Sequence, residues 1–345
     1  MGDGRADLQT HLRAYLRGNV DTPALVTGNT EAEGTPVVFV FTGQGAQWWG
    51  MGRQLLDREP VFRDMVTRID ALLRPLSGWS LLTEMTRPQA TSRIDRTDVA
   101  QPAIFALQVG LAELWRAWGV HPAAVVGHSV GEVAAAYVAG IYTLEGAVKI
   151  ICHRSRLQNT TGGHGGMAAV GLPPADAAAA IGEAQDRVQI SAINSPGLVT
   201  LAGDTEPLAA ILAELEAADV FVRRLPIDYA FHTHQMEPIS GAVVGGVWLT
   251  YSRTPRRRSL FLHRLRRATD RLGDDGRVLV AQRAPARPLS PPRWRRSSET
   301  GMYAFLELGP HPALRSALLA CLAEAGRAAM SSIRSAGPRP GRRRR

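Results

Sequence analysis

The segment from Gly127 to Glu132, which reads Gly-His-Ser-Val-Gly-Glu, constrains the fold of this chain more than any other part of its sequence. It follows an apolar run at 123–126 and precedes a helix-forming run at 133–137. Strand, glycine, serine, glycine, helix is the layout of a nucleophile elbow, whose sharp turn exposes the serine hydroxyl. The start of the following helix favours negative charge beside that hydroxyl. The sequence therefore predicts Ser129 as a nucleophile, with a purely structural turn as the alternative.

Two arginine-rich stretches account for the positive charge of the chain. The formal net charge is +9, yet residues 252–298 alone hold 14 arginines and three acidic residues. Residues 334–345 add six arginines and no acid. Without these stretches the chain would be acidic, so its charge does not indicate a basic binding surface. We therefore expect no nucleic-acid partner.

Cysteine usage and hydropathy indicate a cytoplasmic protein. Cys152 and Cys321 are the two cysteines, which are too few for a disulfide framework. The sequence contains no apolar run long enough to cross a membrane, and residues 1–5 lack the apolar core of a signal peptide. We expect no membrane partner, no metal and no bound cofactor.

Strand–turn–helix units on both sides of the elbow predict an α/β fold. Units of this kind build a parallel sheet that is covered by helices on both faces. We expect the core to comprise residues 36–162 and 226–330, preceded by a linker or arm at 1–35. The expected strands lie at 37–41, 123–126 and 302–308, and the expected helices at 7–17, 49–76, 101–118, 130–139, 144–158 and 313–327.

Residues 163–225 predict a separate small subdomain. Their order of strands and helices, βαββαβ, is that of the ferredoxin-like unit. We expect it to be inserted into the larger α/β core, with the second helix starting at a cap formed by Asp204 and Thr205. The expected strands are 167–170, 188–192, 198–202 and 220–225, and the expected helices are 174–184 and 205–218.

A serine nucleophile needs a base, and His232 is the candidate that the sequence favours. His232 follows the inserted unit, where the chain should return to the main sheet. His234 would face the opposite way in an extended segment. His128 adjoins the serine but is directed away from it by the elbow. A buried structural histidine is the alternative reading of His232.

Four ordered segments of the sequence point to one known family: Phe41 to Trp48, Gly127 to Glu132, Tyr229 to His232 and Leu306 to Pro312. Together they resemble the malonyl-CoA:acyl-carrier-protein transacylase family, and in particular the acyltransferase domains of type I polyketide synthases. The likeness covers about residues 36–240 and 299–334, and Gln101 to Gln108 fits it as well. It implies an α/β-hydrolase-like core with an inserted ferredoxin-like subdomain, in agreement with the pattern of strands and helices.

The resemblance implies a ping-pong acyl transfer in polyketide or antibiotic biosynthesis, a branch of secondary metabolism. Ser129 would attack the thioester of an acyl-CoA donor, and His232 would take its proton. The phosphopantetheine thiol of an acyl carrier protein would then receive the acyl group. The backbone N–H groups of Gln44 and Val130 would form the oxyanion hole. Neighbouring synthase domains would be further partners.

The resemblance also gives Arg154 a role, as the clamp for the free carboxylate of a malonyl group. A guanidinium suits this role because it binds a carboxylate through two parallel hydrogen bonds. A solvated basic helix end is the alternative. Asn194 matches an asparagine near the family's active site, although a turn asparagine explains it equally well. His128 and Asn194 are therefore expected neighbours of the site.

Tyr229 and Phe231 are the residues that the resemblance connects with substrate choice. Related domains that select malonyl-CoA usually read His-Ala-Phe-His here, and those that select methylmalonyl-CoA usually read Tyr-Ala-Ser-His. This chain has one residue of each kind. The Phe231 ring should fill the space that an α-methyl group needs, and Val130 also matches malonyl-type domains. We favour malonyl-CoA over methylmalonyl-CoA as the donor.

The resemblance disappears after about residue 255 and returns at 299. A GC-rich coding sequence for 278–289, translated one base later, restores the family's Tyr-Trp-Trp-Arg-Asn-like stretch. Our hypothesis is that residues 242–298 are a frameshifted translation, and that the arginine-rich tail at 331–345 results from a second shift. The alternative is a diverged basic insertion. We expect residues 242–298 to be poorly packed and the activity of this chain to be reduced. Sequencing of the gene tests the hypothesis, because a frameshift requires compensating insertions or deletions on both sides of the stretch.

Two other functions share the elbow. A serine hydrolase or thioesterase would use the same nucleophile but pass the acyl group to water. Arg154 and the loop 43–47 argue against it, because a hydrolase has no need of a malonyl clamp. A catalytically impaired fragment that only docks carrier protein is the non-enzymatic alternative.

Overall fold

The computed structural model describes residues 5–18, 36–225, 227–239, 304–324 and 334–335. The chain divides into two units, residues 1–35 and residues 36–345. The first unit contains helix α1 (Arg5–Leu16), where the sequence predicts a helix. The expectations for residues 242–298, and for all of the arginine-rich tail except 334–335, lie outside the described residues.

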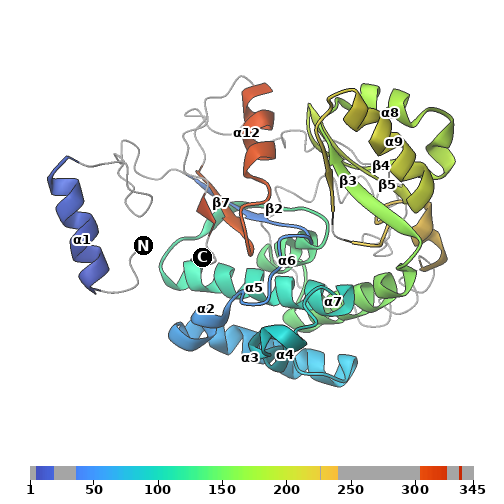
Figure 1. The fold of residues 1–345 in the computed structure, drawn as a ribbon. Coiled ribbons are helices and arrows are strands. Elements are labelled where there is room, and N and C mark those ends of the chain that lie inside the picture. The colour runs from blue at the N-terminus through green and yellow to red at the C-terminus, as the bar shows by residue number, and fades with distance from the viewer. Residues whose placement is uncertain (1–4, 19–35, 226, 240–303, 325–333, 336–345) are drawn as a thin grey trace. The chain divides into compact units, whose positions relative to one another are not determined.

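A parallel sheet forms the centre of the second unit (Figure 1). Strand β1 (Val37–Phe41) pairs in parallel with β2 (Pro122–Gly127) on one side and with β7 (Ala304–Leu308) on the other. Strand β8 (Arg334–Ser335) extends the sheet beyond β7. Phe41 lies opposite both Gly127 and Leu308. The loops that follow these strands therefore leave the same edge of the sheet, which is where open α/β folds bind ligands.

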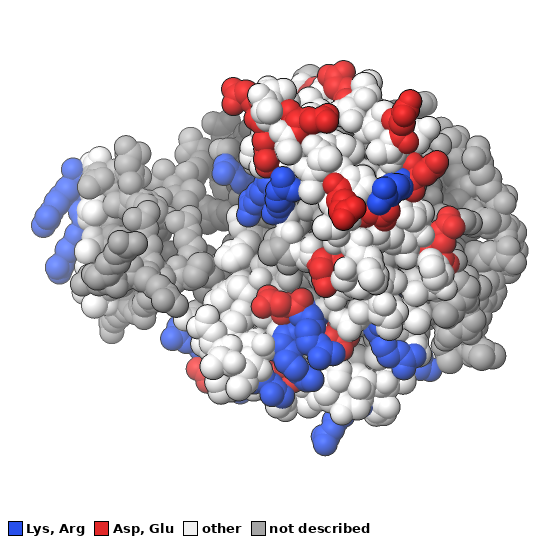
Figure 2. Space-filling model, turned by 45° about the vertical axis from the view of Figure 1, so that its right-hand side comes forward, with Lys and Arg blue, Asp and Glu red and all other residues white. Residues whose placement is uncertain are grey.

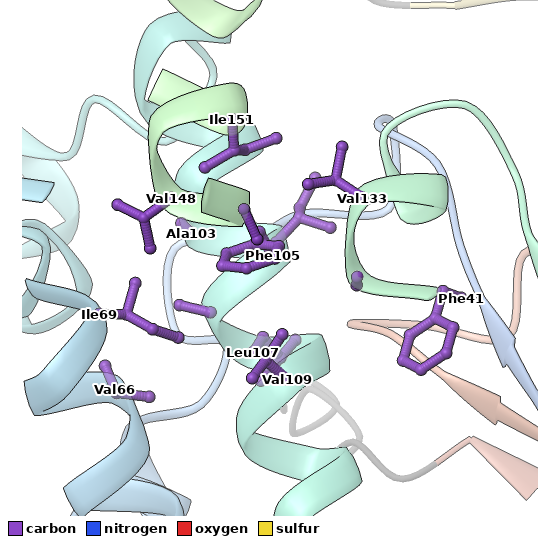
Figure 3. Close-up of a cluster of buried hydrophobic side chains, with 14 of the residues drawn as sticks. Phe41, Val66, Ile69, Ala103, Phe105, Leu107, Val109, Val133, Val148 and Ile151 are labelled. Atoms are coloured by element: carbon purple, nitrogen blue, oxygen red, sulfur yellow. The ribbon is translucent and has the colours of Figure 1, made fainter. Parts of the chain in front are cut away.

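Helix α5 (Thr97–Ala117) lies at the centre of the packing on one face of this sheet. It is buried along almost its whole length, including the interior residue Pro102, as expected for a helix that is apolar all round. Figure 3 shows its residues Phe105 and Leu107 in the same buried cluster as Ile69 and Val148 of neighbouring helices. The helices of this layer are α2 (Arg53–Arg58), α3 (Pro60–Ser77), α4 (Leu81–Thr86), α6 (Gly131–Val138) and α7 (Leu144–Gln158).

The other face of the parallel sheet packs against helix α12 (Arg315–Glu324). Val38 and Val40 of β1 form a small buried cluster with Leu314 and Leu318. The side chain of Glu307 in β7 accepts a hydrogen bond of 2.8 Å from the backbone N–H of Leu314, at the start of α12. The sheet is thus covered on both faces, as the sequence predicts.

A second, antiparallel sheet is built from the βαββαβ segment. Its strands lie in the order β4-β5-β3-β6. This places the first and third strands of the unit side by side in the middle, which is the ferredoxin-like arrangement. The fold class predicted from the sequence is confirmed. The elements are β3 (Gly165–Val170), α8 (Pro174–Ile181), β4 (Val188–Ser195), β5 (Leu198–Asp204), α9 (Thr205–Ala217) and β6 (Val222–Arg224).

The predicted start of a helix at Asp204 and Thr205 is confirmed. Asp204 precedes α9 as its N-cap residue, but its side chain makes no capping hydrogen bond. Its carboxylate turns instead towards Arg187 and Gln235. A short polar side chain caps a helix only when no stronger partner competes for it, and here a guanidinium does.

The described surface carries charges of both signs. Figure 2 shows acidic and basic side chains interspersed over one face of the molecule. Within the described residues, no helix is long and apolar enough to cross a membrane.

Candidate active site

The nucleophile elbow connects β2 to α6 and exposes Ser129 at the carboxyl edge of the parallel sheet. Ser129 has a φ of 52°, which is a strained conformation for a residue with a side chain. The turn closes tightly around it, because a Cβ on Gly127 would lie 2.5 Å from the backbone nitrogen of Glu132. A Cβ on Gly131 would lie 2.4 Å from the carbonyl oxygen of Phe41. Both glycines are therefore needed for the serine to adopt this position.

His232 reaches the serine from the segment that follows the antiparallel sheet. Its Nε2 lies 3.0 Å from Ser129 Oγ, although the two residues are 103 positions apart in the sequence. The histidine follows β6, after the chain has left the antiparallel sheet. Its φ of 64° is also in the left-handed region. His234, two residues later, points to Asp204 and not to the serine.

Arg154 on α7 contacts the same hydroxyl. Its Nη2 donates a hydrogen bond of 3.2 Å to Ser129 Oγ. The arginine is only 7% exposed, which does not fit the alternative of a solvated helix end. Burial lowers the pKa of Arg154 to about 10, and the charge of Glu132 partly offsets this effect. The guanidinium remains protonated at neutral pH and is held inside the site.

Gln101 on α5 holds Arg154, and the sequence reasoning did not single it out as a site residue. Its Oε1 accepts a hydrogen bond of 2.5 Å from Arg154 Nη1. Its Nε2 donates to Gln44 Oε1 at 3.0 Å and to Gln158 Oε1 at 2.8 Å. A glutamine on the buried side of a mostly apolar helix was the available signal, because a buried amide must find partners.

Gln44 belongs to the loop that follows β1. Its side-chain Nε2 donates a hydrogen bond of 3.0 Å to Thr97 Oγ1, so both ends of its amide are held. Val130 follows the serine and is fully buried. Within the described part of the chain, the backbone N–H of neither Gln44 nor Val130 has a protein acceptor. Both groups are thus available to an oxygen atom of a ligand.

His128 and Asn194 lie together, as neighbours of the elbow. Burial lowers the pKa of His128, and a hydrogen bond with the Asn194 side chain opposes this shift. Asn194 also donates a hydrogen bond of 2.9 Å to Thr200 Oγ1 within the antiparallel sheet. This pair therefore joins the elbow to the ferredoxin-like subdomain.

Tyr229 and Phe231 form a buried aromatic pair. Their ring centroids lie 5.1 Å apart and their planes differ by 7°. The Tyr229 hydroxyl donates a hydrogen bond of 3.2 Å to Asn159 Oδ1, and burial raises the pKa of this tyrosine. The stacked pair thus lies just before His232 in the sequence, with Tyr229 three positions and Phe231 one position before it.

Three residues that the sequence predicted, Ser129, His232 and Arg154, thus lie together. A serine hydroxyl lies between an imidazole that can take its proton and a guanidinium that can hold an anion. The backbone N–H groups of Gln44 and Val130 belong to the loops that follow β1 and β2 at the same edge of the sheet. This arrangement can form a covalent ester on Ser129 and can bind an acyl group that carries a carboxylate. In the described residues no group of three or more His, Cys, Asp or Glu is placed to hold a metal.

Comparison with known proteins gives a consistent result. Residues 38–341 match the family described as the acyl transferase domain. The chain is 38% identical over 318 residues to erythronolide synthase EryA2 of Saccharopolyspora erythraea, which covers 91% of this chain and 9% of that protein. It is 40% identical over 327 residues to the spectinabilin polyketide synthase system protein NorA' of Streptomyces orinoci, which covers 94% and 9%. The chain thus spans about a tenth of the length of these relatives.

Solved structures show the same likeness. The acyltransferase domain from module 8 of the salinomycin polyketide synthase superposes with a TM-score of 0.78 at 31% identity, over 97% of this chain and 78% of that one. A loading acyltransferase from the avermectin modular polyketide synthase gives a TM-score of 0.72 at 33% identity, over 84% and 92%.

Proposed function

Because this chain belongs to the acyl transferase domain family, we propose that it moves a malonyl-type acyl group from CoA to the phosphopantetheine thiol of an acyl carrier protein. The reaction would serve polyketide biosynthesis. The observation that carries the proposal is the meeting of three groups on one oxygen: Ser129 Oγ lies 3.0 Å from His232 Nε2 and 3.2 Å from Arg154 Nη2.

The first half-reaction forms an ester on Ser129. His232 Nε2 takes the hydroxyl proton while Oγ attacks the thioester carbonyl carbon. When the tetrahedral intermediate collapses, the C–S bond breaks and the CoA sulfur leaves with the proton that the imidazolium returns. In the second half-reaction, His232 deprotonates the carrier-protein thiol, and the resulting thiolate attacks the ester carbon. The C–O bond to Ser129 then breaks, and the imidazolium returns the proton to Oγ.

The backbone N–H groups of Gln44 and Val130 would stabilise the oxyanion in both steps. Val130 is the residue after the nucleophile and stands at the start of α6, where the helix dipole also favours negative charge. The side chain of Gln44 is held at both ends, so the loop that supplies the second N–H is fixed before substrate binds. Preorganised donors of this kind contribute several kcal/mol to acyl transfer.

Arg154 would bind the free carboxylate of the acyl group. Two of its hydrogen-bond partners, Gln101 and Ser129, are neutral, and burial together with the charge of Glu132 keeps it inside the site. A buried guanidinium prefers a carboxylate partner, with which it forms charge-assisted hydrogen bonds. This preference distinguishes the proposed donor, malonyl-CoA, from an acetyl or propionyl donor.

Incubation of the protein with labelled malonyl-CoA tests the proposal against its alternatives. We expect label on Ser129 that then moves to a carrier protein bearing phosphopantetheine, and no label in the Ser129→Ala variant. Rapid loss of the label to water would instead show a hydrolase or thioesterase. A wild-type protein that takes up no label at all, yet binds carrier protein, would be an impaired docking fragment.

A parallel incubation with methylmalonyl-CoA tests the choice of donor. The Phe231 ring is buried and stacked on Tyr229, so it leaves little freedom for an added α-methyl group. We expect malonyl-CoA to acylate Ser129 faster. A single methyl group is worth only about 1–3 kcal/mol of discrimination, so the difference should be about tenfold to a hundredfold.

A further inference from the structure

The turn that carries His232 is fastened to the antiparallel sheet by its next residues. Gln235 Nε2 donates a hydrogen bond of 2.8 Å to Asp204 Oδ1, at the end of β5. The backbone N–H of His234 donates one of 3.1 Å to the side chain of Gln189 in β4. Each anchor therefore belongs to the ferredoxin-like subdomain.

Asp204 is the centre of this fastening. Its Oδ2 accepts a hydrogen bond of 2.9 Å from Arg187 Nε, and its Oδ1 lies 3.4 Å from His234 Nε2 as well as bonding Gln235. Three side chains from two segments thus converge on one carboxylate. The Arg187 guanidinium, together with the Gln235 amide, holds the pKa of Asp204 below its usual range, so the carboxylate is ionised at neutral pH.

The position of this carboxylate matters because the reacting pair joins two subdomains. Ser129 stands on the parallel sheet, whereas the turn at 233–235 is held by the antiparallel one. The distance of 3.0 Å between the serine and His232 therefore depends on what fixes that turn. Within the described part of the chain, the hydrogen bonds and the ion pair that 233–235 make beyond their own turn go to Gln189, Asp204 and His164.

We propose that Asp204 is a positioning residue for the base: it holds the turn at 233–235 and thereby sets His232 Nε2 against Ser129 Oγ. The proposal rests on the proposed function only in taking His232 as the base. Asp204 touches neither the substrate nor the reacting atoms. Its effect is transmitted through Gln235 and His234 along three residues of backbone.

The proposal separates rate from stability. The Asp204 side chain is 29% exposed and that of Arg187 is 58% exposed, and ion pairs of such exposure add little to folding stability. A small displacement of a catalytic group, by contrast, lowers the rate up to a hundredfold. Removal of the carboxylate should therefore slow acylation far more than it weakens the fold.

The test compares Asp204→Ala and Asp204→Asn with a matched control, Glu216→Gln. The control removes the ion pair between Glu216 and Arg224, which lies in the same subdomain with a spacing of 3.4 Å. The measurement is the single-turnover rate of Ser129 acylation by labelled malonyl-CoA in the full chain. Melting curves of each variant and the Kd of malonyl-CoA in a Ser129→Ala background accompany it.

We expect Asp204→Ala to slow acylation by about tenfold or more, with a Kd within about twofold of the unchanged chain. Asp204→Asn should recover part of the rate, because its amide oxygen still accepts from Gln235. The control should stay within about twofold, as for an exposed ion pair. An Asp204→Ala rate equal to that of the control, or a loss that lies entirely in Kd, would overturn the proposal.

A second readout keeps this inference separate from the choice of donor. A fluorophosphonate reacts with a base-activated serine and needs no malonyl group. If the wild-type chain reacts with fluorophosphonate but not with malonyl-CoA, the proposed function fails, and the same variants still test Asp204. Equal fluorophosphonate rates in the wild type and in Asp204→Ala would overturn the inference in that case.

Discussion

Replacement of Gln101 by glutamate is the sharpest test of how the site treats the charge of Arg154. The variant keeps the size of the side chain but exchanges its NH2 group for an oxygen. At present that NH2 donates to Gln44 at 3.0 Å and to Gln158 at 2.8 Å, while the amide oxygen accepts from Arg154 at 2.5 Å. Gln101→Glu would pair the Arg154 guanidinium with a protein carboxylate. It would also place a carboxylate oxygen next to the amide oxygens of Gln44 and Gln158, which now accept hydrogen bonds from the Gln101 NH2 group.

The magnitude follows from the burial of the pair. Gln101 is 1% exposed and Arg154 is 7% exposed, so water screens their interaction poorly. Two unit charges about 4 Å apart interact by about 4 kcal/mol at an effective dielectric constant of about 20. A malonyl carboxylate would have to compete with this pairing. We expect kcat/KM for malonyl-CoA to fall by about a hundredfold to a thousandfold.

Acetyl-CoA provides the internal comparison, because it carries no carboxylate for Arg154 to bind. Its kcat/KM should fall by no more than about tenfold, which reflects the disturbed hydrogen bonds of Gln44 and Gln158. The ratio of malonyl to acetyl transfer therefore decreases by about tenfold or more. The assay is the initial rate of label transfer to Ser129 from each donor.

Gln108→Glu is the matched control for burying a carboxylate. Gln108 lies two turns further along α5, is fully buried and donates to the backbone oxygen of Thr42 at 2.8 Å. Both glutamate variants should lose stability, but only the one at 101 should change the ratio of donors. An unchanged ratio in Gln101→Glu, or an equal change in Gln108→Glu, would refute the reasoning.

Three further predictions concern Phe231 beside the expected acyl site, the buried Glu307 of β7, and Gly131 of the nucleophile elbow. Phe231→Ser should raise the rate with methylmalonyl-CoA relative to malonyl-CoA by about tenfold to a hundredfold, measured by competition between the two donors. Burial raises the pKa of Glu307, so the folded chain holds its proton more tightly than the unfolded chain. Stability should therefore fall as pH rises above about 4 towards the raised pKa, and Glu307→Gln should flatten this dependence in denaturant titrations. Gly131→Ala should abolish acylation, because the new Cβ meets the Phe41 carbonyl oxygen at 2.4 Å, and labelling of Ser129 measures this.

Each of these predictions has an outcome that contradicts it. An unchanged donor ratio in Phe231→Ser would show that the ring does not border the acyl group. Parallel pH curves for wild type and Glu307→Gln would show that another group causes the dependence. Normal acylation in Gly131→Ala would mean that the elbow relaxes at low cost. A separate melting curve of that variant distinguishes a lost site from a lost fold.

The local parts of the fold were predictable because their signals are local. The apolar run at 37–41 and the Gly-Ser-Gly turn around Ser129 specify a strand and an elbow without reference to the rest of the chain. The βαββαβ order likewise follows from periodicity and turn residues, and the structure has it. Residue boundaries shifted by a few positions, as at β4, which continues to Ser195.

The partners of buried amides were not predictable, because they come from distant segments. Gln101 bonds residues 53 and 57 positions away, and nothing in its immediate sequence identifies them. The same holds for Asp204, where local chemistry predicts a helix cap but Arg187 and Gln235 compete successfully for the carboxylate. Such competition is decided only when the chain has folded.

The two residues that meet in the site share an unusual backbone. Ser129 and His232 both have positive φ values, of 52° and 64°, and each such residue costs about 1–3 kcal/mol. The serine is held in this state by the steric closure of the elbow between β2 and α6. The histidine is followed by the polar fastening through Asp204, whose side chains are partly exposed to solvent. Variants that loosen this fastening should therefore lower the rate before they lower the stability.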